Sequence, residues 1–259
     1  MTAPLPTADR VSLRRRPFPT AADRDARLAA LARELPARLT VRGRLRRGCK
    51  RYLWQAVIGA ARAVKRTFDI VGALVGLVLG LPLFAVIALA IKLTDGGAVL
   101  FWQTRVGQWG AEFPFPKFRS MHLDAEARKA ALMAENQHAE GVTFKMKRDP
   151  RVTWCGRILR KLSLDELPQL WCVLRGTMSL VGPRPPVPDE VAQYTLADRR
   201  RLDARPGLTC IWQVSGRGDI PFPQQVRLDV EYIESQSLWL DLKLLAKTVP
   251  AVLLGRGAY

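Results

Sequence analysis

The chain has little of the side-chain chemistry on which many enzymes depend. Its 259 residues include only two histidines, His122 and His138, which we interpret as ordinary surface residues. Its four cysteines are scattered without C-x-x-C spacing, so we expect reduced thiols in a cytosolic environment and no zinc site. There is no G-x-S-x-G elbow, no Walker loop and no apolar signal-peptide core in the first thirty residues. Serine-hydrolase, P-loop and zinc chemistry are therefore disfavoured.

Positive charge is concentrated near the N-terminus. Residues 1–66 hold 17 Lys and Arg against 4 Asp and Glu, which is +13 of the net charge of +18. We expect residues 1–64 to form a basic, largely disordered arm with at most a marginal amphipathic helix at Asp23–Leu39. The basic run Arg42–Arg51 is either a solvated linker or a contact to lipid headgroups, and the apolar segment that follows favours lipid. The arm has few aromatic residues and no known nucleic-acid motif, so we expect no nucleic-acid partner.

The segment Ile70–Ile91 contains no charged residue. Its 22 residues suffice to cross a hydrocarbon core of about 30 Å, and a buried core helix is the less favoured alternative. Basic residues flank the segment on both sides, although a spanning helix normally has them mainly on its cytosolic side. Pro82, near the middle, removes a backbone donor and kinks a helix. We therefore predict a re-entrant helical hairpin broken at Pro82, with a kinked span as the alternative.

The rest of the chain predicts an α+β, mainly helical domain with a short β element. Strand patterns occur at Val99–Gln103 and Phe113–Met121, and a soluble helix is expected at Asp124–His138, before a basic loop over Phe144–Arg151. Two helices close the chain, Pro223–Ser235 and Leu238–Leu254, the second with Ser237 as its N-cap. The last helix suits either the membrane interface or the core of the domain.

An adjacent pair of carboxylates, Asp165 and Glu166, lies within Lys161–Leu170 among basic residues. One interpretation is structural, because Ser163-x-x-Glu166 matches a capping box. Pro168 argues against it, since proline is disfavoured inside a helix and the helix would then begin nearer Leu167. The functional interpretation divides labour between the two groups: one carboxylate attacks phosphorus and the other holds a divalent cation such as Mg²⁺.

Basic residues nearby have the chemistry to hold phosphate. Arg160 precedes Asp165 by five residues, and Arg184 lies between prolines that keep its backbone stiff and extended. Lys117 and Arg119 are further candidates, although a solvated strand face explains them equally well.

The chain also carries a series of longer motifs, which together resemble those of the bacterial sugar transferase family, the membrane-anchored phosphoglycosyl transferases. The resemblance runs from about Lys65 to Tyr259. Its motifs are Lys65-Arg66-x-Phe68-Asp69, Gln103-x-Arg105-Val106-Gly107, Lys117-Phe118-Arg119-Ser120-Met121, Asp149-Pro150-Arg151-Val152-Thr153, Ser163-Leu164-Asp165-Glu166-Leu167-Pro168-Gln169, Met178-Ser179-Leu180-Val181-Gly182-Pro183-Arg184-Pro185, Arg205-Pro206-Gly207-Leu208-Thr209 and Trp212-Gln213-Val214-Ser215-Gly216-Arg217.

The resemblance implies transfer of a hexose-1-phosphate from a UDP-sugar to undecaprenyl phosphate, with release of UMP. By it, Asp165 is the nucleophile that forms a phosphosugar-aspartyl intermediate, Glu166 binds Mg²⁺, and Arg160 and Arg184 hold phosphates. It also implies a re-entrant membrane helix over residues 65–94 and a cytosolic catalytic domain with interfacial helices over residues 95–259. The C-terminal residues, from Trp239 to Tyr259, resemble the branch that uses UDP-glucose or UDP-galactose to start exopolysaccharide, O-antigen or capsule units.

One departure from the family concerns the helix break. Many members have Ser-Pro there, whereas this chain has Leu81-Pro82 and so lacks a hydroxyl for the freed carbonyl. We expect the protein at the bacterial inner membrane, in contact with membrane lipid and with its catalytic domain on the cytosolic face. Its oligomeric state stays open, with a homodimer as one option. The alternative function is a catalytically idle membrane scaffold for glycan assembly, which the joint presence of the carboxylate pair and the two arginines disfavours.

Overall fold

The structure is a computed structural model that describes residues 25–26, 29–30, 41–125, 127 and 149–254. The chain divides into two compact units, residues 1–56 and residues 57–259. Most of the helix expected at residues 124–138 and of the loop expected at residues 144–151 lies outside the described residues, as do most of residues 1–40.

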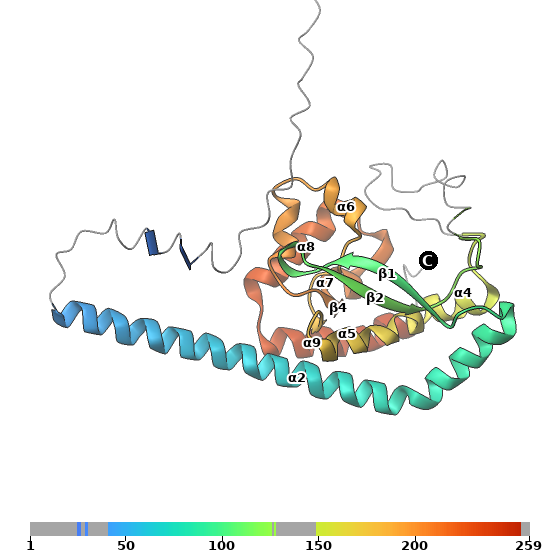
Figure 1. Ribbon diagram of the computed structural model, residues 1–259, viewed down its shortest axis with the longest axis horizontal. Coiled ribbons are helices and arrows are strands. Elements are labelled where there is room, and N and C mark those ends of the chain that lie inside the picture. The colour runs from blue at the N-terminus through green and yellow to red at the C-terminus, as the bar shows by residue number, and fades with distance from the viewer. Residues whose placement is uncertain (1–24, 27–28, 31–40, 126, 128–148, 255–259) are drawn as a thin grey trace, which may run out of the picture. The chain divides into compact units, whose positions relative to one another are not determined.

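One long helix, α2 (Val41–Asp95), contains the whole apolar segment. It begins inside the stretch that the sequence assigns to a largely disordered arm, so residues 41–64 are helical instead. Pro82 lies inside α2, and the structure shows one helix there, where we expected two helices joined at a break. Figure 1 shows the C-terminal part of α2 bending, and proline is a known cause of such bends because it removes a backbone donor.

Two small sheets form the β part of the larger unit. Strands β1 (Leu100–Val106) and β2 (Glu112–Phe118) pair antiparallel, and η1 (Gln108–Gly110) connects them. Both were expected from the sequence, although the second ends earlier than its alternating pattern indicated. Strands β3 (Ser179–Val181) and β4 (Gly207–Thr209) pair parallel. A Cβ on Gly207 would lie 2.0 Å from the backbone nitrogen of Gly182, so this close approach requires glycine.

Short helices make up the rest of this unit, and together with the small sheets they confirm a mainly helical α+β fold. The helices α8 (Phe222–Ser235) and α9 (Leu238–Leu254) match the two predicted at the C-terminus. Ser237 caps α9 as expected, because its Oγ accepts a hydrogen bond of 3.2 Å from the backbone N–H of Leu240. In chain order the elements are α4 (Trp154–Lys161), η3 (Leu164–Gln169), α5 (Leu170–Arg175), α6 (Pro188–Ala192), η4 (Asp198–Leu202), α7 (Ile211–Ser215), η5 (Arg217–Asp219), α8 (Phe222–Ser235) and α9 (Leu238–Leu254).

The inner face of α2 belongs to the hydrophobic core of the larger unit. Ala73 packs in one buried cluster with Leu170 and Val173, and Ile87 packs in a second with Phe118. Small residues allow this approach: a Cβ on Gly72 would lie 2.6 Å from a methyl group of Leu180. The apolar segment is therefore part of the domain rather than an appendage to it.

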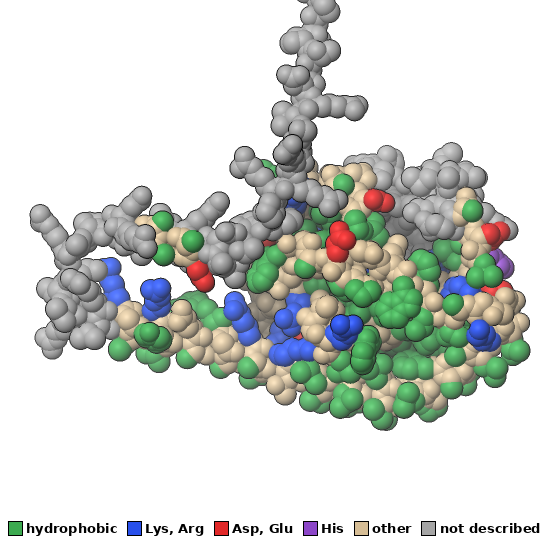
Figure 2. Space-filling model, viewed as in Figure 1, with side chains coloured by type: hydrophobic (Ala, Val, Ile, Leu, Met, Phe, Trp, Pro, Cys, Tyr) green, Lys and Arg blue, Asp and Glu red, His purple; other side chains and the backbone are tan. Residues whose placement is uncertain are grey.

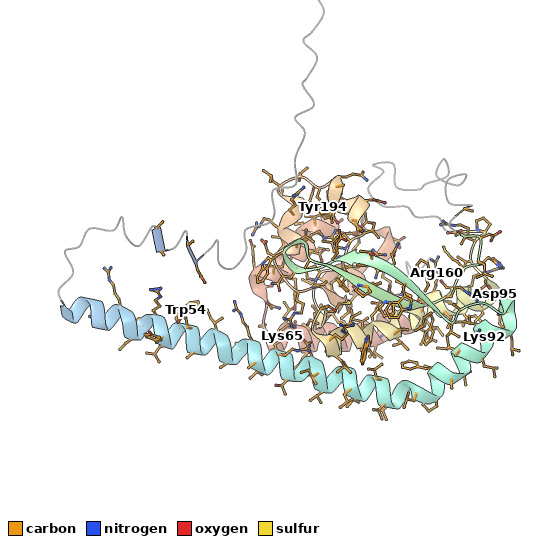
Figure 3. The ribbon with its side chains drawn as sticks, viewed as in Figure 1. Trp54, Lys65, Lys92, Asp95, Arg160 and Tyr194 are labelled. Carbon is orange, nitrogen blue, oxygen red and sulfur yellow. The ribbon has the colours of Figure 1, made fainter. Side chains whose placement is uncertain are left out.

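Polar contacts fasten α2 to the domain before and after the apolar segment. Lys65 forms an ion pair of 2.5 Å with buried Asp241. The carboxylate of Asp69 accepts hydrogen bonds of 3.0 Å from the Ser179 hydroxyl and from the backbone N–H of the following residue. At the other end, Asp95 pairs with an arginine of the segment after β2. Figure 3 shows Lys65 and Asp95 far apart along α2, each beside the same domain.

The outer face of α2 is apolar and exposed. Figure 2 shows hydrophobic side chains along this face, where Val71, Leu79, Val86 and Leu93 are each more than half exposed. Among the described residues, α2 is the one helix long and apolar enough to cross a membrane. Because soluble proteins rarely expose so continuous an apolar surface, this face supports membrane association.

Candidate active site

The two carboxylates of the predicted site lie on η3, a 3-10 turn that precedes α5. Ser163, before the turn, has a left-handed backbone (φ 53°) and its side chain makes no capping hydrogen bond. The capping-box interpretation is therefore wrong. Pro168 lies within the 3-10 turn and α5 begins at Leu170, so Asp165 and Glu166 stand ahead of the regular helix, as the proline indicated.

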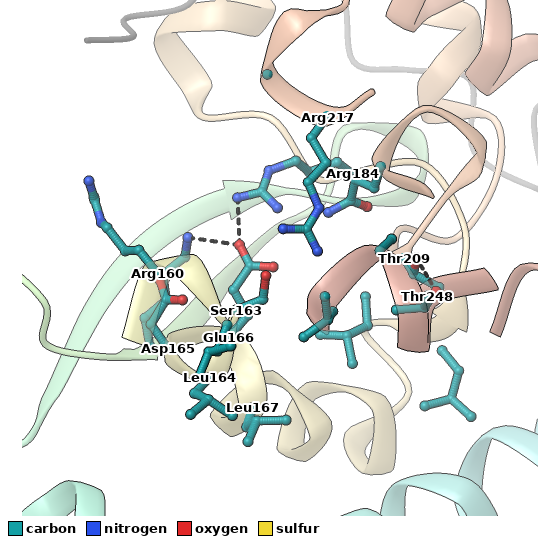
Figure 4. A pocket seen from close by; sticks show the side chains of 18 of the residues that line it. Arg160, Ser163, Leu164, Asp165, Glu166, Leu167, Arg184, Thr209, Arg217 and Thr248 are labelled. Carbon is teal, nitrogen blue, oxygen red and sulfur yellow. Dashed lines mark hydrogen bonds and ion pairs between the residues drawn. The ribbon is translucent and has the colours of Figure 1, made fainter. Parts of the chain in front are cut away.

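A cavity of about 370 Å³ opens over this turn (Figure 4). Its walls come from β2, from α4 and η3, from the segment after β3, from α7 and η5, and from α9. Five of the predicted site residues line it together: Lys117, Arg160, Asp165, Glu166 and Arg184.

Glu166 is held between two cations. Its Oε1 accepts a hydrogen bond of 2.7 Å from Arg184 Nη2 and one of 3.3 Å from Lys117 Nζ. Burial alone would raise the pKa of Glu166, but the charges and hydrogen bonds of Arg184 and Lys117 hold that pKa well below its ordinary value. Glu166 is therefore ionised throughout the physiological range.

Asp165 differs from its neighbour in proton affinity. It is buried, and burial raises its pKa above the ordinary value; the charge of Glu166 adds to the rise, whereas Lys117 and Arg160 oppose it. Of the two carboxylates, Asp165 is the more basic. Such a division, with one group fixed as an anion and the other more basic, is typical of carboxylate pairs that have two roles.

Lys117 has an unusual environment for a lysine. It stands near the end of β2 with its Nζ 5.4 Å from the centre of the Phe115 ring. Burial lowers the pKa of Lys117 to about 8, although the charge of Glu166 acts in the other direction. Its charge is thus sensitive to pH within the working range of an enzyme.

Arg184 is presented by an extended segment, as its flanking prolines predicted. A second arginine, which our physical reasoning did not single out, braces this segment. Arg105 Nη1 donates a 3.0 Å hydrogen bond to the Pro185 carbonyl, and its Nη2 donates one of 2.8 Å to Gln103. Arg105 is partly buried and supports the segment that carries Arg184. Its sequence signal was its place in the Gln103-x-Arg105 motif.

Arg160 and Arg119, both predicted to bind phosphate, lie in different surroundings. Arg160 lines the cavity, and its Nε donates a 3.1 Å hydrogen bond to the hydroxyl of Ser120. Arg119 is buried and pairs with Asp95 at the end of α2; it is not among the residues that line the cavity. The structure therefore does not bring Arg119 together with the other predicted phosphate-binding residues, and its contact is with α2.

The cavity also has residues for which sequence reasoning assigned no role. Arg217 points toward Arg184 and Glu166 in Figure 4, from a backbone with a positive φ of 51° between two glycines. Thr209 and Thr248 lie on another side of the cavity, with their hydroxyls 2.9 Å apart. An arginine between glycines was the available signal for Arg217, since strained backbone conformations cluster at ligand sites.

The carboxylate pair also bears on the expected Mg²⁺. Within the described ranges no group of three or more His, Cys, Asp and Glu side chains is placed to hold a metal. Two adjacent carboxylates nevertheless fit Mg²⁺, which proteins commonly bind through one or two carboxylates with substrate phosphates and water completing its shell. The donor set thus fits a metal shared with a phosphate-bearing substrate, and does not form an all-protein cage.

The cavity thus holds paired carboxylates opposed by lysine and arginine, in a domain that also carries an exposed apolar helix. This arrangement suits phosphate chemistry near a membrane. A profile of the bacterial sugar transferase family matches residues 60–255. The chain belongs to this family, and it is by class a transferase.

Three relatives illustrate the similarity. The chain is 47% identical over 195 residues to the galactosyl transferase CpsE of Streptococcus agalactiae, 44% over 208 residues to the exopolysaccharide production protein ExoY of Rhizobium meliloti, and 42% over 203 residues to UDP-glucose:undecaprenyl-phosphate glucose-1-phosphate transferase of Caulobacter vibrioides. These matches cover 75%, 78% and 75% of this chain. They cover 43%, 92% and 72% of the respective relatives, so the chain spans less than half the length of CpsE but nearly all of ExoY.

Proposed function

We propose that the protein transfers a hexose-1-phosphate from a UDP-hexose to undecaprenyl phosphate and releases UMP, as the first membrane step of exopolysaccharide, O-antigen or capsule assembly. One observation carries this proposal: a buried Asp165 with a raised pKa stands beside a Glu166 that Lys117 and Arg184 keep ionised, in a cavity with further arginines. The names of the relatives, which include a galactosyl transferase and a glucose-1-phosphate transferase acting on undecaprenyl phosphate, support glucose or galactose as the sugar.

The proposed chemistry has two displacements at one phosphorus atom. In the first, an oxygen of Asp165 attacks the β-phosphorus of the UDP-hexose, the bond from that phosphorus to the bridging oxygen breaks, and UMP leaves. In the second, a phosphate oxygen of undecaprenyl phosphate attacks the phosphosugar-aspartyl group and restores the carboxylate. The raised pKa of Asp165 suits this role, because a more basic carboxylate is a better nucleophile once ionised.

The cationic side chains serve the same steps by holding phosphate. Arg184 and Arg160 line the cavity and would bind phosphate oxygens of the donor or acceptor, with Lys117 adding charge. Glu166, with its depressed pKa, would hold Mg²⁺, which when bound would screen the negative charge of the diphosphate from the nucleophile. Burial of Asp165 would limit attack by water on the intermediate.

We also propose that α2 enters and leaves the membrane on one face, with Pro82 at its turning region. The support is that residues before and after the apolar segment contact the same domain, through Lys65 and Asp69 at one end and Asp95 at the other. A helix that spans the bilayer has its ends on opposite sides, about 30 Å apart, where one domain could not contact both. Pro82 within the helix is compatible with such a bend.

The domain would then rest on the cytosolic face of the bacterial inner membrane. Exposed aromatic and aliphatic side chains support interfacial contact by the short helices: Trp154 and Ile158 on α4, Trp171 on α5 and Trp239 on α9 are each more than half exposed. Tryptophan is enriched at membrane–water interfaces because its ring has an apolar body and a polar N–H.

The test is UMP release in detergent with Mg²⁺, undecaprenyl phosphate and a panel of UDP-sugars. We expect release with UDP-glucose or UDP-galactose, none with Asp165→Asn, and normal release with Asp203→Asn, a matched change at an exposed aspartate. Retention of sugar label on denatured wild-type protein would report the intermediate. Initial-rate lines that intersect rather than run parallel would exclude the covalent route, and a well-folded protein inactive with every sugar would support the scaffold function.

A further inference from the structure

The N-terminal part of α2 carries an amphipathic surface that the proposed reaction does not use. This surface lies on residues 46–56, within the smaller unit. On one side, Cys49, Tyr52, Leu53 and Ala56 recur at helical spacing, which places them in one stripe along the helix. Tyr52 and Leu53 are 76% and 66% exposed, so the stripe is a solvent-facing apolar surface.

The other side of the same turns is basic. Arg47, Lys50 and Arg51 lie within one helical turn of one another on this side, and Arg46, seven residues before Leu53, lies at the edge of the apolar stripe; all four side chains are exposed. Trp54 continues this side and is 69% exposed (Figure 3). The two stripes together give a helix with a mainly apolar side and a cationic side that includes an indole ring.

The charge pattern opposes the helix's own stability. The sequence contains no acidic residue between Glu34 and Asp69, and the first turn of α2 has none. Arg46 and Lys50, like Arg47 and Arg51, are like charges four residues apart, and such pairs are unfavourable in a helix because the two charges repel each other. An anionic surface beside the helix would offset this repulsion, whereas a solvated linker would gain nothing from it.

We propose that residues 46–56 lie in the interface of a bilayer and bind anionic phospholipid headgroups. The apolar side would enter the acyl boundary, while the cations and Trp54 stay at the level of the headgroups, where tryptophan is favoured. In sequence, α2 continues from these residues into the apolar segment Ile70–Ile91, which we propose lies in the membrane. Residues 46–56 are therefore tethered near a bilayer. A nucleic acid would satisfy the cations but leave Tyr52 and Leu53 in water.

The chain contains a built-in reporter for this contact. Cys49 is exposed on the apolar stripe, whereas Cys155, Cys172 and Cys210 are buried, so a thiol-reactive NBD dye will label Cys49 selectively in the folded protein. The labelled full-length protein would be placed in nanodiscs of phosphatidylcholine alone, or of phosphatidylcholine mixed with phosphatidylglycerol. Emission wavelength and quenching by doxyl-labelled lipid report whether the dye enters the bilayer.

We expect a blue shift and quenching with phosphatidylglycerol, much less of either in phosphatidylcholine alone, and reversal at high salt, which screens exposed charges. Each Lys or Arg near an anionic surface is worth roughly a fivefold change in the docking equilibrium. Replacing Arg46, Arg47, Lys50 and Arg51 with Gln should therefore abolish the phosphatidylglycerol effect. The control Arg227→Gln, a single exposed charge on α8, should leave it unchanged.

Three outcomes would overturn the proposal. The dye could report equal burial in both lipid compositions, which would mean apolar anchoring without headgroup recognition. It could stay in water in both, which would mean a solvated linker. It could respond to added duplex DNA and not to phosphatidylglycerol, which would assign the surface to nucleic acid. None of these readouts depends on the transferase reaction.

Discussion

At the scale of single residues, the pocket separates two neighbouring carboxylates by giving them different partners. Glu166 receives hydrogen bonds from Arg184 and Lys117, which keep its pKa low, whereas burial raises the pKa of Asp165. Substitutions at Lys117 or Arg184 that keep the positive charge should therefore still alter activity.

Lys117 gives a prediction about pH. Its pKa of about 8 means that the lysine is charged below that pH and neutral above it, so phosphate binding should weaken as pH rises through about 8. We expect kcat/KM for the UDP-sugar, which reports the free enzyme, to fall on that alkaline limb. In Lys117→Arg the limb should move to higher pH, because arginine keeps its charge. A limb that stays in place in that variant would assign it to another group.

Arg184 gives a prediction about geometry. Arg184→Lys keeps the positive charge but loses the planar fork that can bind two oxygens at once. Loss of one charged hydrogen bond costs about 1.5–3 kcal/mol, so kcat/KM should fall roughly 10- to 100-fold. The comparison is Arg227→Lys on the exposed face of α8, which should retain full activity. Equal activity of the two variants would show that Arg184 acts only as a point charge.

At this scale, the position of a side chain could be predicted where nearby prolines restrict the backbone. Arg184 between prolines and the carboxylates before Pro168 could be placed in advance. Lys117 and Arg119 could not be separated, because two residues apart on a strand they should share a face. The strand β2 ends at Phe118, so the alternation stops and Arg119 turns to Asp95 instead.

At the scale of elements, the cavity depends on a close contact between α4 and the segment after β2. Gly156 lies where a Cβ would be 1.9 Å from the backbone oxygen of Ser120, and the Ser120 hydroxyl in turn accepts the hydrogen bond of Arg160. The helix can therefore hold Arg160 in the cavity wall only with glycine at this position.

Gly156→Ala should push α4 away from Ser120 and displace Arg160. Overpacking of this kind costs about 1–3 kcal/mol, which should lower both the thermal unfolding temperature and kcat/KM. Gly59→Ala is the matched control: a Cβ there meets nothing within 4 Å and the site is helical, so stability should be unchanged or rise slightly. If Gly156→Ala kept full stability and activity, the contact between α4 and Ser120 would have to relax without loss.

A buried ion pair joins η4 to α8. Arg201 and Asp229 are both buried, with 2.6 Å between Arg201 Nη2 and Asp229 Oδ2, and the indole N–H of Trp212 donates to the same carboxylate at 3.1 Å. Through Trp212 this pair also supports a wall of the cavity.

Arg201→Met should be strongly destabilising, by about 3–5 kcal/mol, because it leaves the Asp229 carboxylate buried without its cation. Arg201→Met combined with Asp229→Asn should recover much of that loss, since the amide oxygen can still accept from Trp212. Denaturant or thermal unfolding in detergent measures both. A double variant no more stable than Arg201→Met would show that packing, rather than the unpaired charge, dominates.

Elements were predictable where periodicity and caps agreed. The helix over residues 238–254 and its Ser237 cap followed from the sequence. The start of α2 at Val41 did not, because its first eight residues, 41–48, are mostly Arg and Gly and lack the apolar repeat that marks most helices. The 3-10 form of η3 was also not predictable, since it follows a left-handed Ser163.

At the scale of the whole molecule, membrane topology is the property with the sharpest test. Arg62→Cys adds an exposed thiol before the apolar segment and Lys92→Cys adds one near its other end, each in a Cys49→Ser background for separate labelling. In inside-out vesicles, a membrane-impermeant maleimide should label both positions if the segment is re-entrant. Labelling of one position only would establish a spanning helix and overturn the proposed topology.

The packing of α2 has a consequence for how the protein can be divided. Ala73, Ile87 and Ile91 are buried among residues of the catalytic domain, so the same helix that meets lipid on one face completes two hydrophobic clusters on the other. The apolar part of α2 and the catalytic domain therefore fold as one unit rather than as two separate modules. A foreign transmembrane helix in place of α2 could supply attachment, but it could not supply the side chains that α2 adds to the core. The anchor is therefore not exchangeable in engineering or in evolution without repacking the enzyme.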